Sequence, residues 1–312
     1  MIRLGLCCVF REVPIRFRTT TAAVCQTLSR RAALAKLAAL CAENARSLAQ
    51  AIGYCATHEI GAFRIGSGIL PLKTHPAVGY RVDDLPDADA LEASFRQCGA
   101  LARRHGVRLL FHPDQFVLLG SPRADITAAS LAEIEWQAAV SEWVGADVIN
   151  IHGGGGYGDK AAALTRVCRR IERLSDAARA RLTFENDDRV FTPSDLLPLC
   201  RDTGMPFVYD VHHHRCLPDG RPVADITAAA LETWNREPVF HLSSPLNGWR
   251  GPHPNRHADY IRIADFPEEW AEADCTVEVE AKAKEKAVAR LLAALRKRGV
   301  ATTGHARSVN HS

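Results

Sequence analysis

Six short β-rich runs in this 312-residue sequence end in a residue type that commonly binds metal ions. These residues are His112, His152, Glu185, Asp210, His241 and Glu280. Imidazole and carboxylate ligands without a thiolate suit Zn²⁺ or Mn²⁺, and several carboxylates favour Mn²⁺. A single histidine at a strand end is more often a hydrogen-bonded core residue. Six ionisable groups gathered at one place would be costly to bury without a cation, so we expect a metal site.

The segments that position these residues alternate between short strands and longer helices. Eight strands are expected, over Ile2–Cys8, Ala62–Ile65, Val107–His112, Asp147–His152, Arg181–Glu185, Phe207–Val211, Val239–Leu242 and Cys275–Glu280. The clearest helical patterns are Ser29–Ile52, Ala88–Arg104, Ala128–Val144, Lys160–Ala178 and Lys282–Arg298. This alternation predicts an α/β fold, a single (β/α)₈ TIM-type barrel. In that fold the carboxyl ends of the strands meet on one face, which would bring the six residues together.

The whole chain fits one barrel domain, which we expect to span residues 1–298, followed by a flexible polar tail over 299–312. The phrase Asp-Ile-Thr-Ala-Ala occurs at Asp125 and again at Asp225. Threonine is a good helix N-cap, so Thr127 and Thr227 are each expected to cap a following helix.

Composition limits the class of protein without fixing its partner. The formal charge of +3 permits a phosphate-rich partner but does not require one. The ten cysteines include no CxxC pair, so we expect buried free thiols in a reducing cytoplasm. No segment resembles a membrane span or a secretory leader, and nothing indicates an obligate protein partner.

Three loop segments have compositions that suggest a functional role. One is 66–82, rich in Gly, Pro and Lys, and another is 243–255, with Trp249 and Arg250 at a flexible tip. The third is the glycine run Gly153–Gly156, which precedes Tyr157. This run either lets a phosphate backbone approach exposed N–H groups or clears space for neighbouring side chains.

Seven motifs, taken in order, resemble those of the UV-damage endonuclease family, a TIM-barrel relative of endonuclease IV. They are FHPDQF, IHGGGGYGDK, FENDD, YDVHHH, HLSS, HADYI and EVEAKAKE. The resemblance runs from Ile2 to about Leu295. It implies a metal-dependent DNA repair enzyme that cuts damaged double-stranded DNA immediately 5′ of UV photoproducts such as pyrimidine dimers. The enzyme would be cytoplasmic, and associated with the nucleoid when bound to DNA.

The resemblance also implies a role for individual residues. Two or three divalent ions are expected, most commonly Mn²⁺, with Zn²⁺ or Mg²⁺ as alternatives. One ion would be held by His112, His152 and Glu185; a second by Glu185, Asp210, His241 and Glu280; and a third by His213 and His257. Glu185, Glu280 and Lys160 are the expected catalytic residues, and Lys160 and Lys282 would neutralise phosphates. The expected contacts to DNA or to the lesion are Gln115, Phe116, Gly154, Tyr157, Trp249 and Arg250.

Three positions depart from the family pattern. Leu6 and Phe10 stand where a polar, tyrosine-containing segment is expected, and Val239 stands where some members have a modified lysine that helps to hold a metal. Three other functions share parts of the pattern. They are an abasic-site endonuclease of the endonuclease IV type, a metal-dependent sugar isomerase or epimerase, and a DNA-binding barrel that has lost activity.

Overall fold

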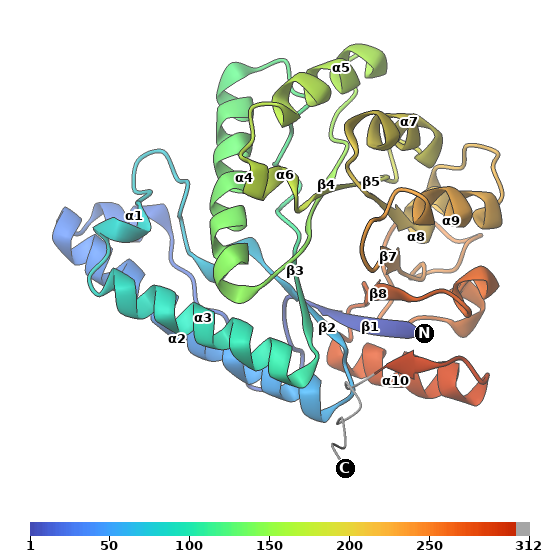
Figure 1. Cartoon of the computed structure of the whole chain (residues 1–312), viewed down its shortest axis with the longest axis horizontal. Coiled ribbons are helices and arrows are strands. Elements are labelled where there is room, and N and C mark those ends of the chain that lie inside the picture. The colour runs from blue at the N-terminus through green and yellow to red at the C-terminus, as the bar shows by residue number, and fades with distance from the viewer. Residues whose placement is uncertain (304–312) are drawn as a thin grey trace.

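Eight parallel strands close into a barrel with the helices on its outside (Figure 1). The structure is a computed structural model and describes residues 1–303. From β2 to β8 the strands follow one another in chain order, and β1 pairs with both β8 and β2, which closes the barrel. The strands are β1 Ile2–Cys7, β2 Ala62–Ile65, β3 Arg108–Phe111, β4 Ile149–His152, β5 Leu182–Glu185, β6 Phe207–Asp210, β7 Val239–Leu242 and β8 Cys275–Val279. The predicted (β/α)₈ barrel is thus confirmed, with every strand in its expected place.

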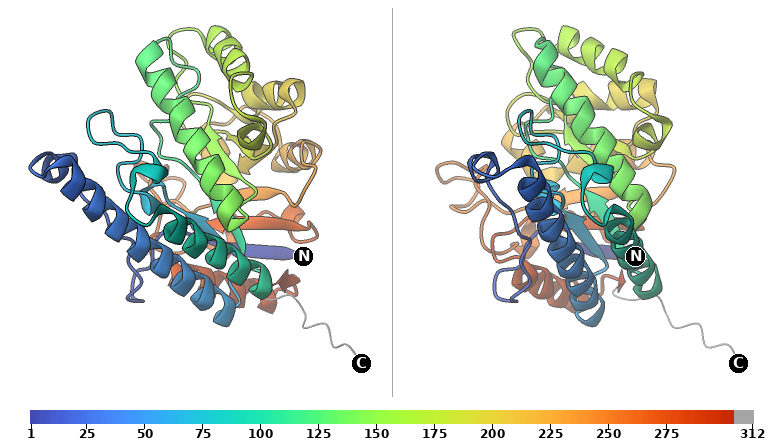
Figure 2. Two further views of the ribbon diagram at one scale, coloured as in Figure 1. Left: turned by 60° about the vertical axis from the view of Figure 1, so that its left-hand side comes forward. Right: turned by 90° about the vertical axis from the view of Figure 1, so that its left-hand side faces the viewer.

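The outer helices differ in length around the barrel. Figure 2 shows helices α2 and α3 running side by side along one edge. The α-helices are α1 Ala22–Gln26, α2 Arg30–Thr57, α3 Ala88–His105, α4 Ala124–Val144, α5 Lys160–Ile171, α6 Asp176–Arg179, α7 Pro193–Thr203, α8 Val211–Cys216, α9 Val223–Leu231 and α10 Glu285–Lys297. Short 3₁₀ turns are η1 Ser67–Ile69, η2 Val82–Asp84, η3 Ile263–Asp265 and η4 Glu268–Trp270. The single helix predicted over Lys160–Ala178 is two helices, because Ser175 caps a new helix at Asp176.

The capping role predicted for the two repeated threonines is wrong. Helix α4 already begins at Ala124, and the hydroxyl of Thr127 donates to the carbonyl oxygen of Arg123 at 2.9 Å. Helix α9 begins at Val223, and the hydroxyl of Thr227 accepts a hydrogen bond from the indole of Trp270 at 3.0 Å. Both hydroxyls therefore bond inside the structure and not to free N–H groups at a helix start.

The end of the described chain adds a short ninth strand. Strand β9 (Thr302–Thr303) pairs in parallel with Ile2 and Arg3 at the start of β1. The rest of the predicted tail, 304–312, lies outside the described residues. All ten cysteines are free, and seven of them are buried. Among residues 1–303, no helix has both the length and the apolar character needed to cross a membrane.

An apolar layer divides the barrel interior into two polar halves. Because side chains alternate along a strand, every second residue points inward, and inward residues of neighbouring strands form layers. The apolar layer consists of Ala62, Leu110, Val148, Val208 and Val239, all fully or almost fully buried. The candidate metal ligands follow it toward the carboxyl ends of the strands, and an ion-pair network lies on its other side.

This ion-pair network joins strands β1, β3 and β8 at the amino-terminal end of the barrel. The Arg3 guanidinium lies 2.8 Å from the Glu237 carboxylate, which also accepts a hydrogen bond from Thr276 at 2.6 Å. Arg108 donates to Thr276 at 3.0 Å and pairs with Asp147 at 2.8 Å. Burial is the largest influence on the pKa of Glu237 and raises it. Hydrogen bonds from Arg3 and Thr276 outweigh burial, so that the pKa lies below its usual value.

Replacing Glu237 with glutamine is expected to destabilise the fold. The variant leaves the positive charges of Arg3 and Arg108 without their shared carboxylate. We expect the free energy of unfolding to fall by about 2 kcal/mol, less than for a fully buried pair because Glu237 is one-third exposed. Denaturant unfolding measures this loss. The control Glu232→Gln breaks an exposed pair with Arg201 and should change stability by less than about 0.5 kcal/mol. Equal losses in both variants would contradict a structural role for the network.

Candidate metal centre

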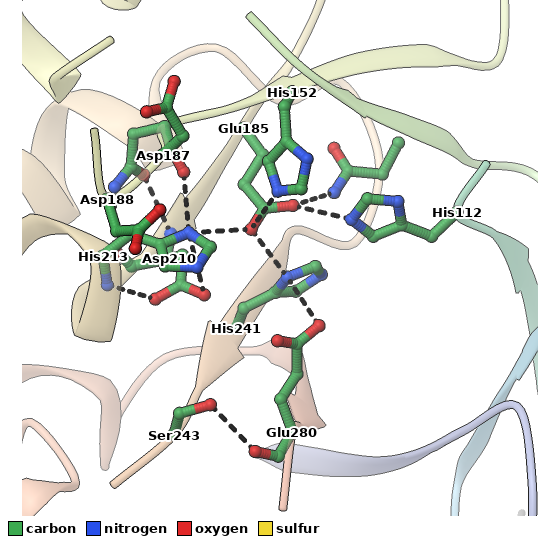
Figure 3. A network of polar contacts seen from close by, with 12 residues as sticks. His112, His152, Glu185, Asp187, Asp188, Asp210, His213, His241, Ser243 and Glu280 are labelled. Carbon is green, nitrogen blue, oxygen red and sulfur yellow. Dashed lines mark hydrogen bonds and ion pairs between the residues drawn. The ribbon is translucent and has the colours of Figure 1, made fainter. Parts of the chain in front are cut away.

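The carboxyl ends of β3 to β8 bring the predicted ligands into one cluster (Figure 3). Within the described residues, three overlapping groups have ligand atoms that all lie within 4.8 Å of one another. They are His112, His152 and Glu185; Glu185, Asp210 and His213; and Asp210, His241 and Glu280. Seven of the eight predicted metal ligands therefore occur in at least one group.

Glu185 lies at the middle of the cluster, with its side chain fully buried (Figure 3). One carboxylate oxygen, Oε2, lies 2.9 Å from His112 Nε2. The other, Oε1, lies 3.1 Å from His241 Nδ1, 3.3 Å from His213 Nδ1 and 3.4 Å from His152 Nε2. The carboxylate thus faces ring nitrogens from four different strands or strand ends. A carboxylate in this position can bridge two ions.

Several buried atoms of the cluster have no hydrogen-bond partner within the described chain. They include Glu185 Oε1, Asp210 Oδ2 and His241 Nδ1. The ring nitrogens around Glu185 Oε1 lie at ion-pair distance, but they lack the geometry of a hydrogen bond. Native proteins rarely leave buried polar atoms unsatisfied, and a missing ion is one standard explanation. The residues present therefore fit divalent cations, which these atoms would coordinate.

The protonation states of Glu185 and His112 suit metal binding. Burial is the largest influence on the pKa of Glu185 and raises it, but the positive charges of His241 and His152 outweigh burial. The pKa of Glu185 therefore lies well below its usual value, and the group is a carboxylate near neutral pH. Burial lowers the pKa of His112, which favours the neutral imidazole that a metal requires. Burial also lowers the pKa values of His213 and His241, but the neighbouring carboxylates outweigh burial and raise both, so these rings would lose a proton when a cation binds.

Behind His241 lies a second buried carboxylate that the sequence analysis missed. Glu278 Oε2 is 2.8 Å from His241 Nε2, on the side of the ring away from Glu185. Arg64 donates to both Glu278 and Glu280, at 3.4 and 2.6 Å. A carboxylate behind a ligating imidazole fixes the orientation of the ring.

Asn150 is a further residue that the sequence analysis missed. Its side-chain amide donates to Glu185 Oε2 at 2.5 Å, and its carbonyl oxygen accepts from Thr183 at 3.0 Å. Asn150 precedes His152 by two residues, and Glu278 precedes Glu280 by two. The period of two along a strand places both residues on the inward face, and this signal could have identified them.

The two histidines assigned by resemblance to a third ion lie at different places. His213, at the start of helix α8, has its Nδ1 3.3 Å from Glu185 and 3.4 Å from Asp210. His257 lies in the loop after β7, with its Nδ1 3.8 Å from Glu280 Oε2, and it belongs to none of the three groups. The two rings are 6.5 Å apart.

Lys160 pairs with a residue that is not a candidate ligand. It begins helix α5, and its Nζ pairs with Asp195 at 2.8 Å.

In the preceding glycine run, a Cβ on Gly153 would lie 2.8 Å from the Phe191 ring, and Gly154 has a φ of +87°. Packing and backbone conformation thus each require one of these glycines.

The five other predicted DNA contacts lie in the loops that follow β3, β4 and β7. Gln115 and Phe116 lie in the loop after β3 and are both exposed, Phe116 by 75%. Tyr157 is 43% exposed. The tip expected to be flexible holds Trp249 in place, because the indole donates to Asp265 at 2.8 Å and packs against His212. Arg250 beside it is exposed.

The three departures from the family pattern are all buried. Leu6 points out of the barrel into the core, and Phe10 packs against the rings of Tyr54 and Phe63. Val239 belongs to the apolar layer beneath the cluster, two residues before His241. A valine in that layer offers no ligand atom. The polar side chains of the centre on β7 and β8 therefore begin at the level of Glu278.

Fold and site together define a TIM-barrel protein whose strand ends carry a cluster of His, Glu and Asp residues that could hold metal ions. Comparison with known families makes the assignment specific. The family model described as UV-endonuclease UvdE matches residues 2–308, and the chain belongs to that family.

Individual relatives agree with this assignment along nearly the whole chain. A UV DNA damage endonuclease of Deinococcus radiodurans is 37% identical, over 95% of this chain and 97% of the relative. One of Bacillus velezensis is 34% identical, over 88% of this chain and 87% of the relative. The crystal structure of SacUVDE superimposes with a TM-score of 0.84 at 25% identity, covering 96% of this chain and all of that chain.

Proposed function

We propose that the protein nicks double-stranded DNA immediately 5′ of UV photoproducts, with two or three divalent cations, Mn²⁺ first among them, held by the cluster. The observation that carries the proposal is the position of Glu185, a buried carboxylate shared by two of the ligand groups, in a chain of the UvdE family. Cations held there would activate water and neutralise charge on the phosphoryl oxygens during hydrolysis.

The protein's own residues would prepare this centre before DNA binds. Asn150 fixes one oxygen of Glu185, and Glu278 fixes the ring of His241. These contacts hold the ligands in place, so that little reorganisation is needed when the phosphate arrives. Glu280 would act as a terminal ligand beside them. The exposed pair Gln115 and Phe116 would fill the gap left when a damaged base pair leaves the stack.

The contribution of Phe116 can be measured separately from that of the metal centre. Phe116→Ala is expected to weaken binding to a dimer-containing duplex about 10-fold, the effect of losing one stacking contact, with little change for undamaged duplex. Stability should be unaffected because the ring is 75% exposed. The control Val24→Ala removes another exposed apolar side chain, in helix α1, and should alter neither property. Equal weakening on both duplexes would argue against lesion recognition by Phe116.

Three end-labelled duplexes test the proposed function directly: one with a pyrimidine dimer, one with an abasic site and one undamaged. Each is incubated with the protein in Mn²⁺ or in EDTA. The proposal expects manganese-dependent nicking next to the dimer, on its 5′ side. Cutting confined to the abasic site would replace the proposal with an abasic-site endonuclease. Absence of cutting on all three, by protein shown to hold metal, would overturn a nuclease function.

A further inference from the structure

A pocket of about 390 Å³ opens beside the candidate metal centre, between the loop after β7 and the loop that joins β8 to α10. Four cationic side chains line it: Arg64, Arg256, Lys282 and Lys284. We call this pocket the basic pocket, after these four residues. It shares His257 and Glu280 with the surroundings of the metal centre, but Glu185, Asp210 and His241 are not among its lining residues. The pocket therefore adjoins the metal centre without coinciding with it.

Within residues 1–303, three of these cations have no acidic partner. In the described part of the chain, no ion pair or hydrogen bond involves the side chain of Arg256, Lys282 or Lys284. Arg64 alone is paired, with Glu278 and Glu280. Like charges gathered around one concave surface raise the local potential and attract an anion. One carboxylate, that of Glu280, faces four cations here, so the basic pocket favours an anionic ligand.

The backbone holds the two lysines in fixed positions. The N–H of Lys282 donates to Ala258 at 3.0 Å, and the next N–H, of Ala283, donates to Asp259 at 2.9 Å. These bonds tie the β8–α10 loop to the loop after β7. Lys284 has a φ of +50°, a conformation that non-glycine residues rarely adopt. A costly conformation persists only where the surrounding structure fixes it, and such residues cluster at functional sites.

The place of the pocket in the fold agrees with a phosphate ligand. In TIM barrels, phosphate groups frequently bind at the loops after the seventh and eighth strands, near the start of a helix. Lys282 and Lys284 follow β8 directly and precede α10, and Arg256 lies in the loop after β7. Arg256 and Lys282 are exposed, so their charges can reach a ligand that arrives from solvent.

We propose that the basic pocket binds one backbone phosphate of the DNA strand, next to the phosphate at the metal centre. This inference rests on the proposed function, because it takes DNA as the substrate. Arg64 would link the two sites, since its guanidinium borders the pocket and also lies 2.6 Å from the candidate metal ligand Glu280. A phosphate held there would fix the register of the strand relative to the metal centre.

Salt-dependent DNA binding gives the first test. Affinity for a labelled duplex is measured in EDTA at a series of salt concentrations, for wild type and for Lys282→Gln, Lys284→Gln and Arg256→Gln. Each lost phosphate contact should lower the slope of log affinity against log salt by about 1. The control Lys297→Gln removes an exposed charge at the far end of α10 and should leave the slope unchanged. Wild-type slopes in all three pocket variants, with folding verified by thermal unfolding, would overturn the proposal.

Neutralising one phosphate at a time gives the second test and separates a specific site from general attraction. A series of dimer-containing duplexes carries a single uncharged methylphosphonate at each position around the expected cut. Wild type should lose affinity at one position adjacent to the cut, and Lys282→Gln should be insensitive to the same replacement. Equal sensitivity of wild type and variant at every position would overturn the pocket assignment.

The two proposals can fail separately. A protein that binds duplex with the expected slopes but nicks none of the three substrates would contradict the proposed function and leave the phosphate pocket standing. A protein that nicks beside the dimer, but whose pocket variants bind as wild type does, would contradict only the pocket.

Discussion

Glu185→Gln is expected to leave the fold intact and to lower the nicking rate about 10³-fold. The amide cannot bridge two cations, and metal ions contribute several kcal/mol of transition-state stabilisation, which corresponds to a factor of this size. The fold should persist because the replacement has nearly the same shape and still fits beside Asn150. Single-turnover nicking and metal content per chain measure the two effects.

The matched control for this variant is Glu142→Gln, the same chemical change at an exposed position of helix α4. It should nick at the wild-type rate. The assignment of Glu185 would be lost if its glutamine variant bound as much metal as wild type and cut within about tenfold of the wild-type rate.

Glu278→Gln is expected to weaken Mn²⁺ binding by about 10- to 100-fold, the usual cost of losing a partner behind a ligating histidine. Glu278 is almost fully buried, and its carboxylate lies 2.8 Å from His241 Nε2. Glu278 also pairs with Arg64 at the edge of the basic pocket, so a role in positioning His241 has to be separated from an effect on DNA binding. A positioning role predicts a specific pattern. The nicking rate at saturating Mn²⁺ should return close to wild type, and only the Mn²⁺ concentration needed for half-maximal rate should rise.

Glu237→Gln serves as the control for this experiment, because it makes the same change at the opposite end of the barrel interior. It should lower stability while leaving the Mn²⁺ requirement unchanged. If Glu278→Gln reduced the saturated rate without shifting the Mn²⁺ requirement, Glu278 would not act through His241.

Much of this molecule follows from its sequence for simple physical reasons. Parallel strands that are buried on both faces form continuous apolar runs, so the strands could be recognised in the sequence. Their order around a barrel follows from their order in the chain. The ligands stood out because His112, Glu185 and Asp210 each end such a run. Convergence of strand ends in a barrel then predicted the cluster, and it brings seven of the eight predicted ligands into shared groups.

The parts that escaped prediction depend on contacts between elements. Asn150 and Glu278 look like ordinary strand residues until the closed barrel places them against Glu185 and His241. Helix α4 begins at Ala124, before Thr127, and no side chain caps that start, so the local preference of Thr127 did not indicate it. Lys160 pairs with Asp195, and nothing in the sequence around Lys160 indicates that partner.

The apolar layer of the barrel has a consequence for how cations and water reach and leave the cluster. The interior of a TIM barrel is a packed core and not a pore, and this layer with the Arg3–Glu237 network separates the cluster from the amino-terminal end of the barrel. Everything that reaches the cluster must enter and leave by the one open mouth. DNA bound over that mouth would therefore trap the cations beneath it, and exchange of one metal for another would have to wait until the DNA departs.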